Sequence, residues 1–306
     1  MKREDIVVGE NTEYPLNGML TLPDNTDTPV PAVILVHGSG MSDMDESVGY
    51  ITPFKDLAYG LAEHGIASIR YDKRTLAHMS SMMQNKDLII SVKEETTEDA
   101  LLATELLRND PRIDKDNIFI IGHNLGGMMA PRIDDEGGNY KGLILIGSTP
   151  RKLEEILIDQ NKDAYNKMNF ILKLLYGGSS RSFNTSFRGI YNLTDEKAKK
   201  KMLGTGATAY YFKDIGEHTI EAYLDKLHKP MLIMQGDQDK QVKVEKDFNA
   251  YKELLKDRDN VTFKLYENIN HLLVDHIKHS LLQYGEELHI SEEIVTDIAS
   301  WIKETV

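Results

Sequence analysis

The residues best placed to do chemistry surround position 124. Residues 122–127 read Gly-His-Asn-Leu-Gly-Gly; they follow an apolar run at 117–121 and precede Met-Met-Ala, which is typical of a helix start. Glycines in such a strand–turn–helix setting allow a sharp turn that lifts the central side chain clear of the backbone. A serine at its centre would be an acyl-accepting nucleophile, but the carboxamide of Asn124 has no hydroxyl or thiol that a base could activate. The turn therefore has the form of a nucleophile elbow without its nucleophile.

Two later segments supply a carboxylate and an imidazole. Residues 235–242, Gln-Gly-Asp-Gln-Asp-Lys-Gln-Val, directly follow a strand-like run and contain Asp237 and Asp239. His271 lies in the turn after the last strand-like run. In an acyl-transfer site, this histidine would take a proton from the nucleophile and return it to the leaving group, while an aspartate fixed its tautomer. Both aspartates are candidates for that role.

A third segment, residues 37–40 with the sequence His-Gly-Ser-Gly, can supply electrophilic groups. A glycine-rich turn at a strand end can point a backbone N–H toward a developing oxyanion, and the N–H of Leu125 would be a second donor. We assign the first donor to Ser39, with Gly40 as the alternative. Nothing local offers the Ser39 hydroxyl a base, so we do not interpret it as a replacement nucleophile.

The surrounding pattern predicts how these segments are positioned. Short apolar runs alternate with amphipathic stretches, which indicates an α/β fold with a mostly parallel sheet covered on both faces. Because parallel strands end at one edge of the sheet, the three segments should converge there. We expect helices over about 96–108 and 291–302. Strands are expected at residues 6–8, 16–23, 31–36, 66–70, 117–121, 142–146, 230–235 and 261–266.

The residue composition changes between the two parts of this predicted core, residues 1–150 and 229–306. Residues 151–228 are polar and aromatic without a convincing strand, and we interpret them as a helical lid insertion over the strand ends. Helices are expected there over 153–168, 195–202 and 217–227. The lid aromatics that we single out as substrate contacts are Tyr210, Tyr211 and Phe212. Packing of these rings between lid and core is the alternative.

The bulk composition excludes several classes of function. With 36 basic and 49 acidic residues, the net charge of −13 argues against nucleic acid and anionic membranes as partners. The absence of cysteine excludes disulfides, a thiol nucleophile and Cys-based zinc sites. His271, His276 and His279 have no acidic ligand set beside them, so no metal is expected, and no phosphate-binding glycine motif implies an organic cofactor.

The expected location is the cytoplasm. The first residues have no apolar core of signal-peptide length, and no run approaches the 18 to 20 or so apolar residues that span a bilayer. A signal peptide that had been removed would leave the same sequence. A homodimer is compatible with the sequence, which carries no signal that decides the oligomeric state.

Two further signals receive structural interpretations. Residues 70–74, Arg-Tyr-Asp-Lys-Arg, are expected to brace the loops beside the site through ion pairs rather than to clamp a charged substrate. Met79, Met82 and Met83 are interpreted as a flexible, partly buried loop near the mouth of the pocket rather than as metal ligands.

Taken with these motifs, nearly the whole chain resembles the α/β-hydrolase superfamily, and within it bacterial esterases of the serine aminopeptidase-like and feruloyl-esterase-like type. In that group the elbow reads Gly-His-Ser-x-Gly-Gly, so this chain departs from the pattern at Asn124. The resemblance implies a small-molecule ester substrate, an acyl-enzyme mechanism and Asp239 as the acid, with Asp237 in reserve. The most specific matching segments are 36–40, 53–58, 70–74, 116–132, 235–242 and 270–272.

Asn124 then has three interpretations. Because the other parts of the site look intact, we favour an isolated inactivating substitution, engineered or natural, in an active esterase. The alternatives are a natural ligand-binding protein on a hydrolase fold, or a latent aspartate formed by deamidation. The sequence leaves the scissile bond open among ester, amide, thioester and lactone, because all four pass through the same oxyanion.

Overall fold

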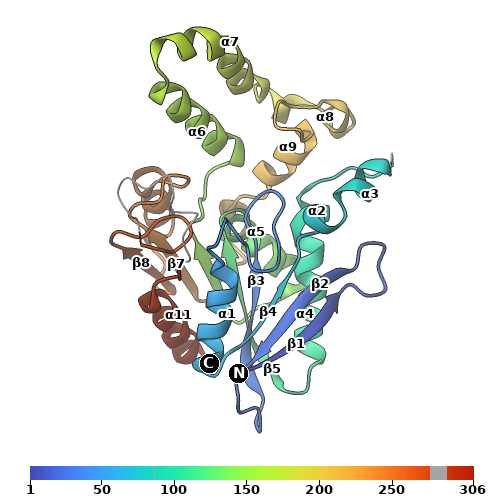
Figure 1. Cartoon of the computed structure of the whole chain (residues 1–306), viewed down its shortest axis with the longest axis vertical. Coiled ribbons are helices and arrows are strands. Elements are labelled where there is room, and N and C mark those ends of the chain that lie inside the picture. The colour runs from blue at the N-terminus through green and yellow to red at the C-terminus, as the bar shows by residue number, and fades with distance from the viewer. Residues whose placement is uncertain (86, 276–287) are drawn as a thin grey trace.

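An eight-stranded sheet forms the centre of the molecule (Figure 1). The computed structural model describes residues 1–85, 87–275 and 288–306; His276 and His279, considered above as metal ligands, lie outside these ranges. The strands are β1 (Lys2–Val8), β2 (Leu16–Leu22), β3 (Val30–Val36), β4 (Ala67–Tyr71), β5 (Ile113–His123), β6 (Leu143–Ile146), β7 (Met231–Gly236) and β8 (Val261–Tyr266).

The strand order is β1-β2-β4-β3-β5-β6-β7-β8. The pairs β1–β2 and β2–β4 are antiparallel, and all the other neighbours are parallel. The predicted mostly parallel α/β fold is therefore confirmed, and each predicted strand overlaps an observed one. The carboxyl ends of β3, β5, β6, β7 and β8 meet at one edge of the sheet.

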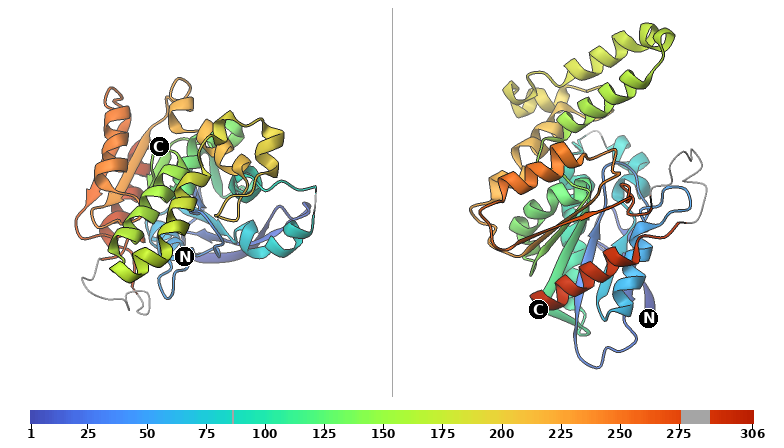
Figure 2. Two further views of the ribbon diagram at one scale, coloured as in Figure 1. Left: turned by 90° about the horizontal axis from the view of Figure 1, so that it is seen from above. Right: turned by 90° about the vertical axis from the view of Figure 1, so that its left-hand side faces the viewer.

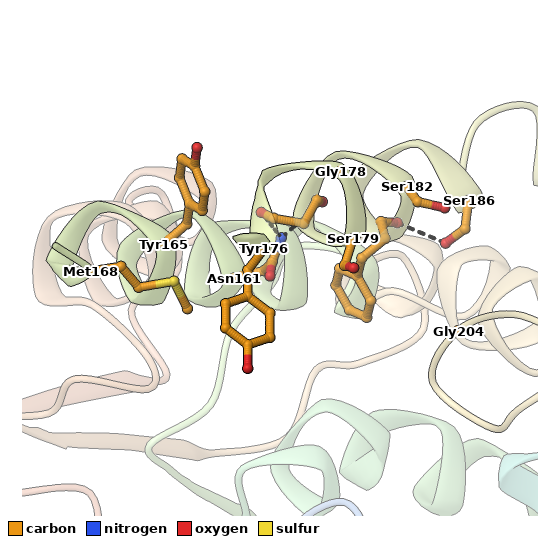
Figure 3. Close-up of a pocket in the computed structure, with 11 residues that line it drawn as sticks. Asn161, Tyr165, Met168, Tyr176, Gly178, Ser179, Ser182, Ser186 and Gly204 are labelled. Carbon is orange, nitrogen blue, oxygen red and sulfur yellow. Dashed lines mark hydrogen bonds between the residues drawn. The ribbon is translucent and has the colours of Figure 1, made fainter. Parts of the chain in front are cut away.

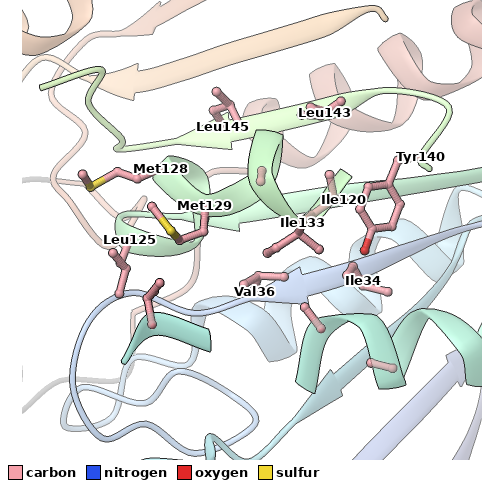
Figure 4. Packing of buried hydrophobic residues seen from close by; sticks show 14 of the residues in the cluster. Ile34, Val36, Ile120, Leu125, Met128, Met129, Ile133, Tyr140, Leu143 and Leu145 are labelled. Atoms are coloured by element: carbon pink, nitrogen blue, oxygen red, sulfur yellow. The ribbon is translucent and has the colours of Figure 1, made fainter. Parts of the chain in front are cut away.

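Helices cover both faces of the sheet. They are α1 (Pro53–Glu63), α4 (Glu98–Asn109), α5 (Leu125–Ile133), α10 (Asn249–Leu254) and α11 (Glu292–Thr305). On β3, Val33 and Leu35 belong to the core beneath α1 and α11, whereas Ile34 and Val36 belong to the core beneath α4 and α5. Figure 4 shows the second core, where α5 packs on β3, β5 and β6. Burial of each such side chain contributes about 1.5–3 kcal/mol, which holds the strand ends in place.

The segment between β6 and β7 is helical and stands over the sheet edge (Figures 1 and 2). Its long helices α6 and α7 form a hairpin that projects from the body of the molecule. Its helices are α6 (Leu153–Lys167), α7 (Phe170–Ser186), α8 (Asp195–Lys200) and α9 (Ala209–Glu217), with short 3₁₀ turns at Ile190–Asn192 and Ile220–Tyr223. We keep the word lid for residues 151–228.

Two of the lid helices differ from the sequence-based expectation. The predicted helix over 217–227 is wrong: the helix in this part of the lid is α9, which ends at Glu217, where the predicted helix begins. Thr219 is extended, and only a 3₁₀ turn follows. Helix α7 was not predicted, because Gly177 and Gly178 in its middle each cost about 1 kcal/mol of helix propensity. Within the described residues, no helix combines the length and the apolar character needed to cross a membrane.

Short elements link β4 to α4 beside the lid. Helices α2 (Arg74–Ala77) and α3 (Met79–Gln84) follow β4, and a π-helical turn, Lys93–Thr97, runs directly into α4. Such turns place an extra residue in the helical ladder and occur frequently at functional sites.

Candidate active site

The elbow at Asn124 lies where β5 ends and α5 begins. Asn124 has φ 50° and ψ −112°, a strained backbone for a residue with a side chain, which persists only where the surrounding structure holds it. The turn packs closely against the end of β3: a Cβ atom on Gly126 would lie 2.1 Å from the carbonyl oxygen of Val36. Glycine at this position therefore lets the elbow press against the neighbouring strand and present the side chain of Asn124.

His271 and Asp239 meet beside the elbow. The Nδ1 atom of His271 lies 2.6 Å from Oδ2 of Asp239, and both residues are buried. The other oxygen of Asp239 accepts hydrogen bonds from the backbone N–H groups of Gln241 (2.8 Å) and Val242 (2.9 Å), which hold the carboxylate in place. Glycine at 147 leaves room for this pair, because a Cβ there would come within 3.2 Å of Nδ1 of His271.

Asp237 points elsewhere. Its Oδ1 accepts a hydrogen bond of 2.7 Å from the backbone N–H of Asn268, in the turn after β8. The structure thus brings Asp239 to His271 and gives Asp237 a role in holding the turn.

The carboxamide of Asn124 connects the imidazole to the elbow backbone. Because Nδ1–H of His271 donates a hydrogen bond to the carboxylate, Nε2 carries no hydrogen and accepts from Nδ2 of Asn124 at 3.1 Å. The Oδ1 atom of Asn124 accepts from the N–H of Leu125 at 2.8 Å. One side chain therefore occupies both the group predicted as base and one N–H predicted as an oxyanion donor.

The loop at residues 38–40 offers one unoccupied N–H beside Asn124. The N–H of Gly38 donates to Oε1 of Glu46 at 2.7 Å, and the N–H of Gly40 donates to Oε1 of Glu95 at 3.2 Å. Among the described residues, no acceptor is found for the N–H of Ser39 between them. Ser39 and Asn124 line the same small cavity, so this N–H is the one in the loop that remains for a ligand.

A buried pair that sequence reasoning missed lies behind His271. Nδ1 of His123 forms an ion pair of 2.9 Å with Oε2 of Glu46, and Nε2 of His123 donates to the backbone carbonyl of His271 at 2.9 Å. Burial alone would lower the pKa of His123, but the Glu46 carboxylate raises it above its ordinary value. Burial opposes ionisation of Glu46 as well, yet His123 keeps the pKa of that carboxyl below its ordinary value. His123 belongs to the elbow motif, but no sequence signal singles out Glu46.

A second buried cluster lies on the other side of the loop. Nζ of Lys73 donates to the carbonyl oxygen of Gly38 (2.6 Å) and to Oε1 of Glu95 (2.5 Å). The hydroxyl of Tyr211 on α9 donates to Oε2 of Glu95 at 2.5 Å. The ion pair of Lys73 agrees with the bracing role predicted for residues 70–74, and Glu95, on the π-helical turn, is a further residue that the sequence did not reveal.

Two cavities meet at Ser39. The smaller, about 50 Å³, includes Asn124 in its lining, and the larger, about 540 Å³, lies under the lid. The walls of the larger cavity are mainly aliphatic and include Met79 and Met83, whereas Met82 is buried in the core. Its apolar lining residues are Met41, Met79, Met83, Leu88, Ile89, Ile90, Leu153, Leu157, Met202, Ala207 and Phe212.

The structure separates the three lid aromatics singled out above. Tyr211 and Phe212 line the larger cavity. Tyr210 lines neither cavity, and its ring lies 4.9 Å from Nζ of Lys199 instead. Successive residues of a helix point about 100° apart, so three neighbours on α9 do not face one site.

A third hollow, of about 660 Å³, lies between α6 and α7 (Figure 3). Tyr165, Met168 and Tyr176 are among its lining residues, and the lining includes neither the elbow nor the loop at 38–40. It is therefore separate from the site around Asn124.

Comparison with known proteins identifies the family of this chain and solved structures that share its fold. Residues 27–276 match the family model described as "Serine aminopeptidase, S33". The chain is 34% identical over 293 residues to the esterase EstD of Thermotoga maritima. This alignment covers 94% of the present chain but only 65% of EstD.

Two solved structures share the fold. Est1E from Butyrivibrio proteoclasticus aligns with a TM-score of 0.60 at 17% identity over 98% of both chains. The Pyrococcus furiosus esterase Pf2001 aligns with a TM-score of 0.60 at 16% identity, over 99% of this chain and 91% of the other.

Proposed function

The chain belongs to the serine aminopeptidase S33 family of α/β-hydrolases, and on this premise we propose that it is a carboxylic-ester hydrolase whose nucleophile position carries asparagine. The observation that carries the proposal is the hydrogen-bonded series Asp239–His271–Asn124 beside the unoccupied N–H of Ser39. Similarity to EstD and to two solved esterases supports the ester as substrate class.

The reaction follows from the positions of these groups once serine stands at 124. The serine oxygen attacks the ester carbonyl carbon while Nε2 of His271 takes its proton, and the N–H groups of Ser39 and Leu125 stabilise the oxyanion. His271 then gives the proton to the departing alcohol, which leaves an acyl-enzyme. Water, deprotonated by His271, attacks the acyl carbon and releases the acid. Asp239 keeps Nδ1 protonated and stabilises the imidazolium.

We propose further that the chain as written turns over negligibly. The carboxamide of Asn124 has no proton whose removal would generate a useful nucleophile, and it engages both Nε2 of His271 and the N–H of Leu125. Loss of a triad nucleophile leaves a residual acceleration of roughly 10³ to 10⁴ over water, from binding and the oxyanion hole.

The larger cavity supports an apolar acyl group. Its volume of about 540 Å³ suits a mid-sized ligand, its lining is mainly aliphatic, and its methionine side chains can adapt to a flexible aliphatic chain. We therefore expect the acyl chain in this cavity and the alcohol on the side of the smaller one.

The test uses p-nitrophenyl esters from acetate to dodecanoate with three proteins: the chain as written, Asn124→Ser and Asn124→Ala. Serine should raise kcat/KM by roughly 10⁴ to 10⁶, with a maximum at intermediate chain length. Asn124→Ala is the matched control, because it frees His271 and the N–H of Leu125 without adding a nucleophile, and it should stay inactive. Intact mass must show that no Asn124 has deamidated.

Equal rates for Asn124→Ser and Asn124→Ala across the panel would contradict the esterase proposal. The same proteins should then be assayed with amides, thioesters and lactones. Tight retention of a ligand without hydrolysis of any bond would favour a binding protein on this fold.

A further inference from the structure

We propose that Glu46 and Glu95 are positioning residues that hold the two ends of the loop at 38–40, so that of its three N–H groups only that of Ser39 faces the reacting carbonyl. The kinetic consequences of this proposal rest on the proposed hydrolase function. Each carboxylate occupies one neighbouring N–H of the loop, at Gly38 and at Gly40. Each also connects the loop to a second part of the site.

Glu46 connects the loop to the base. Its Oε1 accepts from Gly38, and its Oε2 faces His123, which in turn donates to the backbone carbonyl of His271. Glu46 and His123 are both buried, and their mutual attraction offsets the cost of removing two charges from water. Glu46 also has φ 54°, an unfavourable backbone for glutamate that its surroundings must maintain. The placement of the oxyanion donor and of the imidazole thus depends on one carboxylate.

Glu95 connects the loop to the lid. Its Oε1 accepts from the N–H of Gly40 and from Lys73, and its Oε2 accepts from Tyr211 on α9. Lys73 also donates to the carbonyl oxygen of Gly38 in the same loop. Tyr211 also lines the cavity proposed for the acyl chain. A displacement of α9 would therefore move Glu95 and, through it, the N–H of Gly40 in the loop.

Because both carboxylates hold the loop, the N–H of Ser39 is oriented before a substrate binds. A donor that is aimed before the reaction stabilises the oxyanion without reorganisation, and loss of one such donor costs about 10² to 10³ in kcat. A displaced donor should cost less than a missing one. We therefore expect kcat to respond to these carboxylates more strongly than KM.

The Glu46 side is tested in the Asn124→Ser background. Glu46→Ala should lower kcat by about 10- to 100-fold and change KM by less than about threefold. Glu46→Gln should restore most of the rate, because its carbonyl can accept from Gly38 while its amide donates to a neutral His123. Full activity in Glu46→Ala would overturn the proposal, and so would equal losses in the two variants.

The Glu95 side is tested with a matched pair of tyrosines in the lid. Tyr211→Phe removes a hydroxyl donated to Glu95, whereas Tyr191→Phe removes one donated at 2.6 Å to the buried Glu154, away from the loop. With the acetate ester, too short to fill the larger cavity, Tyr211→Phe should lower kcat about three- to tenfold and Tyr191→Phe by less than twofold. Equal effects on kcat would overturn the link between lid and loop.

A measurement without turnover separates this proposal from the proposed function. In the chain as written, the amide protons of Gly38 and Gly40 should exchange with solvent more slowly than that of Ser39. Glu46→Ala should accelerate exchange at Gly38 and leave Gly40 unchanged. If Asn124→Ser hydrolyses no ester of the panel, the esterase proposal fails, and this exchange pattern still decides whether the carboxylates hold the loop. Unchanged exchange at Gly38 would overturn the proposal.

Discussion

The edge of the sheet and the outer lid hairpin are built in opposite ways. Around Asn124, the side chains of His271, Asp239 and Glu46 are buried, and each is tied to backbone groups or to one another. Helix α7 has no buried residue, and 76% of Leu174 is exposed. Helix α9 contacts α6 of the hairpin, and its Tyr211 donates a hydrogen bond to Glu95 beside the loop at 38–40.

The difference shows where this molecule needs exact geometry. Groups that transfer a proton or stabilise an oxyanion must lie within about half an ångström of their working positions, which requires buried partners. A wall of an apolar cavity needs only contact and flexibility. We therefore expect substitutions to be costly at the sheet edge and nearly silent at the outer hairpin.

The largest effect is expected from the acid beside His271. In the Asn124→Ser protein, Asp239→Asn should lower kcat by about 10⁴, because the amide would donate to Nδ1 and impose the wrong tautomer. Asp237→Asn is the control two residues away, and its carbonyl can still accept from Asn268. Steady-state kinetics with one ester measure both. A comparable loss in Asp237→Asn would show that the turn, and not the tautomer, controls the rate.

The next effect concerns the packing beneath the site. Leu145 on β6 is fully buried between β5 and β7, so Leu145→Ala should lower the free energy of unfolding by about 2–5 kcal/mol. Guanidinium denaturation at pH 7 measures the change. A loss below 1 kcal/mol would mean that this end of the sheet tolerates cavities and that rigid packing does not hold the site.

A pH effect of intermediate size is expected at His37. Burial lowers the pKa of His37 from 6.5 to about 4. The contribution of the neutral imidazole to stability is therefore fully present above pH 6.5 and is lost as the pH falls toward 4. Between pH 7 and pH 5 this costs about 2 kcal/mol of unfolding free energy. His37→Asn should remove that part of the pH dependence, while His228→Asn, at an exposed histidine, should not. Parallel curves for the parent and His37→Asn would contradict the assignment.

The smallest effect is expected at the outer hairpin. Leu174→Ala deletes the same atoms as Leu145→Ala but from a side chain that is 76% exposed, so unfolding free energy should change by less than about 0.5 kcal/mol. The same denaturation experiment compares the two. A loss approaching that of Leu145→Ala would show that this helix is covered in solution.

Much of the fold could be predicted because its signals are local. Alternating and continuous apolar runs predicted all eight strands, and the elbow, the turn at 235–242 and His271 each follow a strand whose direction topology determines. The lid was harder to predict from the sequence. Gly177 and Gly178 lower the helix propensity of α7, which forms in contact with α6.

What the sequence determined by itself is the chemistry available at each strand end: a carboxamide where a nucleophile would stand, an imidazole, two aspartates and a glycine-rich loop. The family resemblance favoured Asp239 as the acid but kept Asp237 in reserve, because both lie on one turn; the tertiary structure shows that Asp239 faces His271 and that Asp237 has a different partner. It also decided which loop N–H stays free, since the two acceptors at Glu46 and Glu95 lie 8 and 55 residues away from their donors. Local residue patterns specify strands and turns, but hydrogen bonds between distant segments depend on how the packed elements align them.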